Sequence, residues 1–363
     1  MKVAFIVEHF YPHIGGGEKL FADLAGSLVP RGVEIRVVTS DSGGVRGQHT
    51  DRGVATFHHR WPSLFDHPIA LRRDLVEHVR WADLVQTTQY TAAPAAIAVA
   101  HRLGKPCVFV AYEFLGRRWQ LVAGGPRGHA FQLFERWVFA KAYDRIVALS
   151  QATARDLTDA GIGAGKISTI YPVFNDFAFW RGRGRPTDST FLYYGRPGKT
   201  KGVFLLLDAI RILDRRLPEQ WRFEFILSDE PARDRRAFLA AVKRSGLGSR
   251  VITSRPLPLE QLRARLDAAY CVIVPSLTEG FGYSAFQAVC MGKHIIASTA
   301  GSLPEVVSGS FLLFESGSAE ALAEAIVKAT EGRFTRAPAR ISHDGTERMI
   351  DLYRSVLMHD PSR

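Results

Sequence analysis

The sequence is poor in the features that mark secreted and membrane-spanning proteins. It has only three cysteines, Cys107, Cys271 and Cys290, and their odd number and apolar or helical surroundings argue against a disulfide framework. No run reaches the length of about 18 apolar residues that a membrane span requires, and Met1–Val7 is typical of a first strand rather than of a signal peptide. We therefore expect reduced, buried thiols and a cytoplasmic protein.

Further absences limit the ligands. The sequence has no Asp-x-Asp triplet and no cluster of His, Cys and carboxylate residues, so no metal site is expected. It also lacks helix-turn-helix, ribonucleoprotein and zinc-finger patterns, although its formal net charge is +11. The positive charge is shared almost equally by residues 1–175 and the remainder. Phosphorylated substrates and an anionic membrane surface are thus better expected partners than nucleic acid.

The length and the apolar periodicity predict two α/β domains. A chain of 363 residues exceeds what one hydrophobic core usually supports. Short apolar runs alternate with helical patterns, and this alternation restarts after residue 175, which is typical of two doubly wound parallel sheets. The expected strands are Val3–Val7, Ile35–Thr39, Leu84–Gln86, Cys107–Ala111, Ile146–Leu149, Phe191–Tyr194, Phe223–Leu227, Val251–Ile252, Cys271–Val274 and His294–Ala297.

The boundary between the domains is expected within Tyr171–Arg185, where proline, glycine and arginine interrupt the periodicity. We therefore expect an N-terminal domain over residues 1–175 and a C-terminal domain over residues 176–343. A last helical pattern, Asp344–Met358, has no strand after it. We expect residues 344–363 to pack back on the N-terminal domain.

Two glycine-rich loops join an expected strand to an expected helix. The first, Gly15-Gly16-Gly17-Glu18, precedes the helix Lys19–Leu28, and its amides can approach an anion as readily as they can make a tight connection. The second runs from Gly195 to Gly202 before the helix Val203–Leu213. Its cations at positions 196 and 201 favour a pyrophosphate clamp over a merely solvated basic loop.

A third segment, Val274–Ala288, carries the strongest pattern. An expected strand ends, a turn follows with Glu279, Gly280 and Gly282, and a helix begins near Tyr283. Such a turn can direct a carboxylate and several amides at sugar hydroxyls, while the start of the helix faces phosphate. A charge at a helix start or a solvated turn residue remains the alternative for Glu279.

Five segments in this order give the sequence a family resemblance. They are the loop at residues 15–18, Asp144–Thr153, Gly195–Gly202, Pro275–Gly282 and Gly301–Val307. Together they resemble the large retaining GT-B glycosyltransferase family, which includes sucrose synthases and bacterial mannosyl- and glucosyltransferases. The resemblance implies an α/β fold of two Rossmann-like doubly wound domains facing a central cleft. It also implies retaining transfer of a hexose from a nucleotide diphosphate sugar, GDP-mannose or a UDP-hexose, to a glycan or lipid-linked acceptor, without metal or other cofactor.

The resemblance also implies roles for individual residues. Gly16 and Gly17 would lie against the donor diphosphate, Arg196 and Lys201 would neutralise it, and Glu279 would hold the hexose with nearby amides. The implied donor-binding residues are Gly16, Gly17, Arg196, Lys201, Glu279, Gly280, Phe281, Gly282, Tyr283 and Gln287, and the implied catalytic residues are Glu279, Arg196, Lys201 and Tyr112.

Two of these residues depart from the family pattern. Gln287 stands where the family has an acid that holds the ribose, and Tyr112 stands where it has a histidine near the sugar. A catalytically silent, sugar-nucleotide-binding partner of an active transferase therefore stays open, as do a nucleotide-sugar epimerase and a phosphorylase on the same fold. Basic and aromatic residues also make a peripheral location on the cytoplasmic membrane face an open prediction. They are Arg72, Arg73, Arg117, Arg118 and Trp119.

Overall fold

The computed structural model describes residues 1–11, 15–40, 47–51, 53–59, 68–89, 91–175, 179–182, 186–213 and 216–358. The chain divides into two compact units. Unit 1 comprises Met1–Trp119, Gly125–Asn175 and Ser342–Arg363, and unit 2 comprises Gln120–Gly124 and Asp176–Ile341. No helix in the described part of the chain is long and apolar enough to cross a bilayer.

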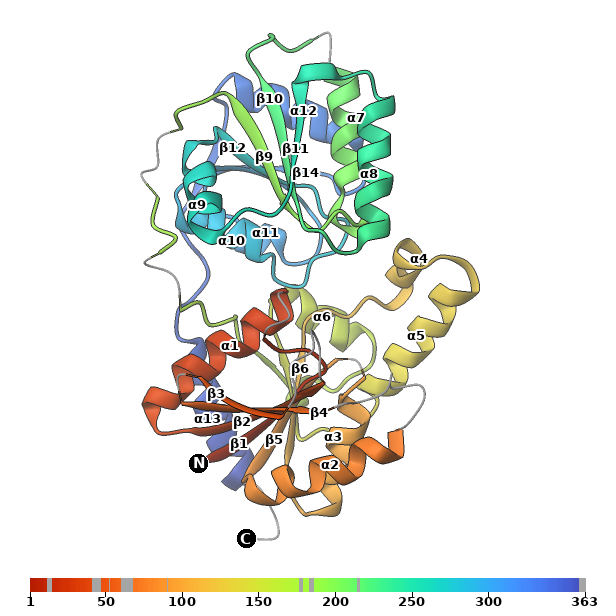
Figure 1. Cartoon of the computed structure of the whole chain (residues 1–363), viewed down its shortest axis with the longest axis vertical. Helices are drawn as coiled ribbons and strands as arrows, with labels where there is room; N and C mark the ends of the chain where they lie inside the picture. The colour runs from red at the N-terminus through yellow and green to blue at the C-terminus, as the bar shows by residue number, and fades with distance from the viewer. Residues whose placement is uncertain are drawn as a thin grey trace. The chain divides into compact units, whose positions relative to one another are not determined.

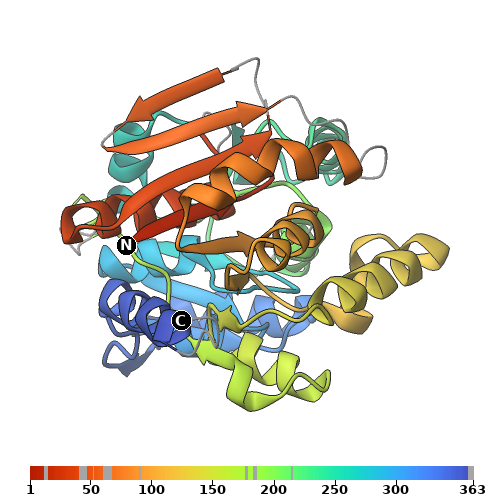
Figure 2. The same cartoon turned by 90° about the horizontal axis from the view of Figure 1, so that it is seen from below.

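Unit 1 is built on an eight-stranded sheet in the order β3-β4-β2-β1-β5-β6-β7-β8. All neighbouring pairs are parallel except β3 with β4, at the edge that Figure 2 shows in orange. Because helices cover both faces, the central strands are buried, including every residue of β5 and of the apolar β6. The strands are β1 Lys2–Ile6, β2 Glu34–Ser40, β3 Gly47–Asp51, β4 Val54–His59, β5 Leu84–Thr88, β6 Cys107–Ala111, β7 Arg145–Ala148 and β8 Ile167–Thr169.

The helices of this part of the chain alternate with its strands. They are α1 Gly16–Leu28, α2 Pro68–Trp81, α3 Ala93–Arg102, α4 Trp119–Val122, α5 Gly125–Phe139 and α6 Gln151–Asp159, with short 3-10 turns η1 Val29–Arg31, η3 Gly116–Arg118 and η4 Ala164–Lys166. Serine is a favoured N-cap residue, and at the start of α6 the hydroxyl of Ser150 accepts a hydrogen bond from the amide of Thr153 at 3.0 Å.

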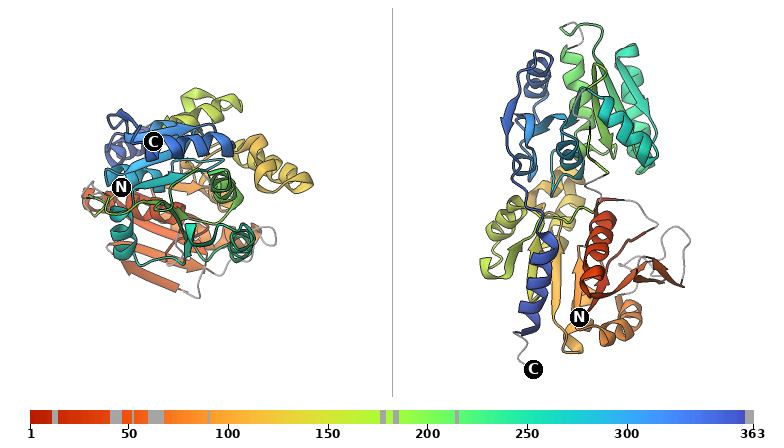
Figure 3. Two further views of the ribbon diagram at one scale, coloured as in Figure 1. Left: turned by 90° about the horizontal axis from the view of Figure 1, so that it is seen from above. Right: turned by 90° about the vertical axis from the view of Figure 1, so that its left-hand side faces the viewer.

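The last helix, α13 (Gly345–Met358), packs on unit 1 beside α1 (Figure 3). The hydroxyl of Tyr353, which is fully buried, donates to the side-chain oxygen of Gln86 on β5. At the start of the helix, a Cβ on Gly345 would lie 2.6 Å from the carbonyl oxygen of Tyr171, so only glycine fits there. The helix thus joins unit 1 through buried polar and apolar contacts.

Unit 2 repeats the architecture with a seven-stranded sheet in the order β11-β10-β9-β12-β13-β14-β15 (Figure 1). Only β15 is antiparallel to its neighbour. Its strands are β9 Thr190–Gly195, β10 Arg222–Leu227, β11 Val251–Ser254, β12 Cys271–Val274, β13 His294–Ser298, β14 Gly309–Phe314 and β15 Thr335–Ala337. Its helices and 3-10 turns are η5 Lys199–Lys201, α7 Val203–Leu213, α8 Ala232–Arg244, η6 Gly248–Arg250, α9 Leu259–Ala268, α10 Tyr283–Cys290, α11 Leu303–Val306 and α12 Ala319–Thr330.

The two Rossmann-like sheets confirm the α/β fold class expected from the sequence. The structure adds strands that the sequence did not predict, among them β3, β8 and β15. These strands lie at sheet edges, β3 and β15 largely exposed and β8 half-buried, so they lack the buried apolar runs that identified the central strands. The three cysteines are free, with Cys107 and Cys271 buried.

Candidate active site

The central loops of unit 2 meet at the carboxyl edge of its sheet. β12 pairs in parallel with both β9 and β13, so the loops that follow these three strands emerge side by side. Backbone hydrogen bonds join them. The amide of Leu277 donates to the carbonyl of Thr200 at 2.7 Å, and the amide of Ser302 donates to the carbonyl of Glu279 at 3.0 Å.

Two glycines permit this close approach of backbones. Gly202 has φ +71°, and a Cβ at this position would lie 1.8 Å from the carbonyl oxygen of Pro275. Gly301 has φ +51°, and a Cβ there would lie 2.0 Å from the carbonyl oxygen of Glu279. Because both conformations are left-handed and both positions are crowded, only glycine is accommodated. These glycines of the third and fifth family segments therefore fix the position of the loop that carries Glu279.

Lys201 and Glu279 form an ion pair between two of these loops. The Lys201 Nζ lies 3.0 Å and 2.9 Å from the two carboxylate oxygens, and the hydroxyl of Ser276 donates to Oε2 at 2.9 Å. The side chains are 25% and 11% exposed, respectively. The expected diphosphate-binding cation and the expected hexose-binding carboxylate thus neutralise each other, and neither is fully buried.

Arg196, the other expected cation, lies directly after β9 with an exposed side chain. Its backbone is fixed, because the hydroxyl of Tyr193 donates to the Arg196 carbonyl at 2.6 Å. Burial raises the pKa of Tyr193 and so does the charge of Glu279, whereas the Arg196 cation opposes them. Tyr193 therefore stays a protonated donor that holds the loop and leaves the guanidinium facing solvent.

Gln287 contacts a residue that the sequence reasoning missed. The hydroxyl of Tyr194, at the end of β9, lies 2.8 Å from Gln287 Oε1 and 2.9 Å from the carbonyl of Ser284. Burial raises the pKa of Tyr194 well above its ordinary value, so the hydroxyl keeps its single proton and can donate to only one of these oxygens at a time. The side-chain carbonyl of Gln287 thus faces a donor within the protein.

The turn before α10 buries one aromatic side chain and enters the helix through a glycine. Phe281 is 4% exposed, and its ring lies 5.4 Å from that of Phe286, so this side chain belongs to the core. Gly282 precedes the helix with φ +86°, and α10 begins at Tyr283. The Phe281 ring is therefore not available to a ligand.

In unit 1 the expected residues gather after β1 and β6. A Cβ on Gly17 would lie 2.7 Å from the hydroxyl oxygen of Tyr112, so glycine at this position admits the tyrosine against the start of α1. Burial raises the pKa of Tyr112, and the nearby Glu18 and Glu8 carboxylates raise it further. Tyr112 is therefore a neutral hydrogen-bond donor, unlike the histidine that the family pattern places there.

A buried glutamine fixes the backbone beside Tyr112. The side-chain oxygen of Gln89 accepts from the amides of Tyr112 at 2.8 Å and Glu113 at 3.3 Å. Gln89 is 5% exposed and follows β5 directly. The sequence reasoning missed this residue, because a lone glutamine after a strand carries no recognisable pattern.

The expected residues thus form two groups, each at the carboxyl edge of its own sheet. Gly16, Gly17 and Tyr112 lie in unit 1, whereas Arg196, Lys201, Glu279, Gly280, Phe281, Gly282, Tyr283 and Gln287 lie in unit 2. In the described part of the chain, no group of three or more His, Cys, Asp and Glu side chains is arranged to hold a metal ion.

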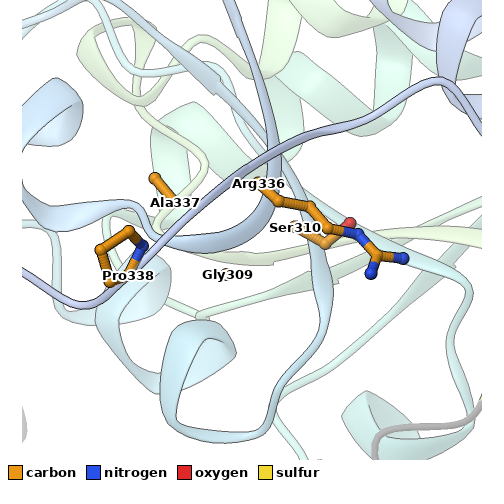
Figure 4. A pocket seen from close by; sticks show the side chains of 5 residues that line it. All are labelled: Gly309, Ser310, Arg336, Ala337 and Pro338. Carbon is orange, nitrogen blue, oxygen red and sulfur yellow. The ribbon is translucent and has the colours of Figure 1, made fainter.

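A surface pocket of about 440 Å³ lies elsewhere in unit 2 (Figure 4). It is lined by Gly309, Ser310, Arg336, Ala337 and Pro338. The first two residues begin β14, whereas Glu279 and Ser302 follow the ends of β12 and β13. Because these strands are parallel, the pocket lies at the amino edge of the sheet and is not part of the loop cluster.

Both halves of the chain match glycosyltransferase families. Residues 14–176 match Glycosyltransferase Family 4, and residues 176–348 match Glycosyl transferases group 1. The GDP-mannose:cellobiosyl-diphosphopolyprenol alpha-mannosyltransferase of Xanthomonas oryzae is 28% identical over 312 residues, which cover 82% of this chain and 78% of the relative. The MMP alpha-(1->4)-mannosyltransferase of Mycolicibacterium hassiacum is 28% identical over 216 residues, which cover 57% of this chain and 51% of the relative.

Solved structures share the fold over the whole chain. Sucrose-phosphate synthase from Thermosynechococcus elongatus aligns with a TM-score of 0.77 at 20% identity and covers 98% of this chain and 96% of its own. The Anabaena protein HepE, solved in complex with UDP and glucose, aligns with a TM-score of 0.75 at 19% identity and covers 98% of this chain and 100% of its own. Since the two family matches follow each other along one chain and the fold agrees, the protein belongs to the GT-B glycosyltransferases.

Proposed function

We propose that this glycosyltransferase moves a hexose, with retention of anomeric configuration and without a metal ion, from a nucleotide diphosphate sugar to a glycan or lipid-linked acceptor. The observation that carries the proposal is the Lys201–Glu279 ion pair, which Ser276 supports from the same loop cluster. A cation and a carboxylate that are held together, yet partly exposed, suit a donor with an anionic diphosphate and a sugar rich in hydroxyls.

In the proposed mechanism, the donor diphosphate takes the cation from the carboxylate. Lys201 and the exposed Arg196 then stabilise the negative charge that develops as the bond between the anomeric carbon and the phosphate oxygen breaks. Glu279, released from Lys201, accepts hydrogen bonds from sugar hydroxyls. The acceptor oxygen bonds to the anomeric carbon on the face that the diphosphate leaves, and its proton passes to a phosphate oxygen. No protein nucleophile is assigned.

Cationic side chains also support the metal-independent part of the proposal. Arg196 and Lys201 both follow β9 and can supply the positive charge that a divalent ion supplies in other transferases. In unit 1, α1 begins at Gly16, and the backbone amides at the start of a helix favour an anion. The protonated Tyr112 would serve as a hydrogen-bond donor in the acceptor-side unit.

The names of similar proteins guide the choice of donor. Two relatives are mannosyltransferases, and the name of the Xanthomonas enzyme gives GDP-mannose as donor and a diphosphopolyprenol-linked sugar as acceptor. We therefore propose GDP-mannose as the first donor to test and a lipid-linked glycan as the first acceptor class, at the cytoplasmic face of the membrane. A UDP-hexose is the alternative, since the HepE structure holds UDP and glucose.

A donor screen with turnover measurements tests this proposal. We expect GDP-mannose or a UDP-hexose to raise the melting temperature of the chain and to be consumed when acceptor is present. Lys201→Ala should lose most of this stabilisation, whereas Lys243→Ala, which alters an exposed lysine on α8, should keep it. Nucleotide binding without any transfer would instead favour a silent partner, which the departures at Gln287 and Tyr112 make a specific second candidate.

A further inference from the structure

The outer side of α5 carries an apolar stripe that faces solvent. Pro126, Ala130, Leu133, Trp137 and Ala140 follow one another at intervals of three or four residues, which places them along one side of the helix and its end. All five are exposed, and the exposed fractions are 68% for Leu133 and 49% for Trp137. Figure 1 shows α5 in yellow at the periphery of unit 1.

The stripe is separate from the side of α5 that packs on unit 1. Gly128, Glu135, Val138 and Phe139 are buried, and the ring of Phe139 lies 5.0 Å from that of Phe109 on β6. The helix therefore has its core contact already and exposes a second apolar side. A contiguous apolar stripe on the surface of a protein marks an interaction surface.

Cations and no exposed carboxylate accompany the stripe. Arg127 and Arg136 are exposed, and the Lys141 Nζ lies 3.8 Å from the centre of the Trp137 ring. Glu135 is the sole acidic residue from 114 to 143, and its side chain is fully buried.

The Glu135 carboxylate is engaged by the backbone rather than by the solvent. Its two oxygens accept from the amides of Leu115 at 3.0 Å and Gly116 at 2.7 Å. The outer surface of α5 therefore combines apolar side chains with positive charge only.

We propose that the outer surface of α5, formed by the stripe together with Arg136 and Lys141, docks unit 1 on an anionic lipid bilayer. Leucine and tryptophan enter the boundary between headgroups and acyl chains, while long cationic side chains reach the phosphates beside them. Nucleic acid fits this surface less well, because Leu133 offers nothing to a phosphate backbone or to a base edge. The surface would hold the acceptor-side unit where a lipid-linked acceptor resides, a consequence that rests on the proposed function.

The sequence suggested other basic residues for a membrane surface, and of these Arg73 and Arg117 are exposed. Arg118 forms an ion pair with Asp156, and its guanidinium also donates to the carbonyl of Phe114, so it is committed within unit 1. The Trp119 ring stacks on Phe131 with centres 5.0 Å apart. Arg72 lies outside the described side chains. The apolar part of the surface was missed because Leu133 and Trp137 fit a helical pattern that is usually core.

Vesicle sedimentation of the full chain tests the proposal directly. We expect the chain to bind vesicles of phosphatidylcholine mixed with phosphatidylglycerol at low salt, and to bind phosphatidylcholine alone far more weakly. The double variant Leu133→Ser/Trp137→Ser should bind at least about tenfold more weakly. The loss of one cation should weaken vesicle binding roughly fivefold. Arg136→Glu should weaken it by more than this, because the substitution also introduces a negative charge.

Matched variants control for general effects of polarity and charge. Leu259→Ser changes a leucine of unit 2 that is 52% exposed, and Arg236→Glu reverses an exposed charge on α8; both should bind vesicles as the parent does. Transfer to a water-soluble acceptor should be unchanged in the Leu133→Ser/Trp137→Ser variant, so failure of docking is distinguishable from failure of the proposed function. The proposal is wrong if the parent ignores the anionic vesicles or if the double variant binds them equally well. It is also wrong if the parent is a dimer that ignores vesicles and the double variant is a monomer, which would make the stripe a protein interface.

Discussion

Replacing Gln287 by glutamate should tighten nucleotide diphosphate binding about fivefold. In the parent chain the hydroxyl of Tyr194 lies 2.8 Å from Gln287 Oε1, so the single acceptor atom of the amide is shared with a donor inside the protein, while Nε2 can only donate. A carboxylate at this position has a second oxygen, so it can accept from Tyr194 and from the ribose at the same time. The magnitude follows from the charge of the new acceptor. Hydrogen bonds to charged groups contribute about 1.5 to 3 kcal/mol and neutral ones about 0.5 to 1.5 kcal/mol, a difference of about 1 kcal/mol.

Calorimetry with GDP and UDP measures this effect, and two further variants frame it. Gln287→Ala should weaken binding by a similar factor, because one neutral hydrogen bond is lost, and should narrow the preference for the ribo over the 2′-deoxyribo donor. Gln261→Glu makes the same change of charge at an exposed position of α9 and should leave the affinity unchanged. If Gln287→Glu and Gln287→Ala both bind nucleotide like the parent, Gln287 is a packing partner of Tyr194 and the ribose is held elsewhere.

Three further outcomes are expected. Arg196→Ala and Lys201→Ala should each weaken nucleotide diphosphate binding by about 2 kcal/mol in calorimetry, since each removes a charge-assisted contact. Unchanged affinity in both variants would contradict the proposal that these residues bind the diphosphate. Transfer should continue in excess EDTA because cationic side chains supply the positive charge, and a loss that only manganese or magnesium restores would contradict this. Burial raises the pKa of the Cys107 and Cys271 thiols, which keeps them protonated near neutral pH. Iodoacetamide should therefore leave both thiols of the native chain unlabelled, as measured by mass spectrometry. Rapid labelling of either thiol would show that it is accessible to solvent.

Sequence reasoning predicted those central strands whose burial on both faces leaves an uninterrupted apolar run. β6 (Cys107–Ala111) and β12 (Cys271–Val274) have the same bounds in the prediction and in the structure. Strand β3 escaped prediction because all five of its residues are exposed, so no apolar alternation distinguishes it from a polar loop.

The site divides in a similar way. Glycines at 202 and 301 mark the loops in sequence, because a left-handed backbone crowded against another loop excludes every other residue. The pairing of Lys201 with Glu279 and of Tyr194 with Gln287 could not be derived, because each pair joins residues 78 or 93 positions apart through the order of the strands. Each loop can therefore be predicted from its own sequence, whereas the contacts between loops depend on the order of the strands in the sheet.

The stereochemistry of transfer by the purified chain tests the central claim most directly. The reaction would contain GDP-mannose or a UDP-hexose with a lipid-linked or soluble glycan acceptor, and NMR of the product would identify its anomeric configuration. We predict an α-linked product from an α-linked donor, formed by the parent and strongly reduced in both Lys201→Ala and Glu279→Gln. A β-linked product, or transfer that survives both substitutions undiminished, would contradict retaining transfer at the Lys201–Glu279 site.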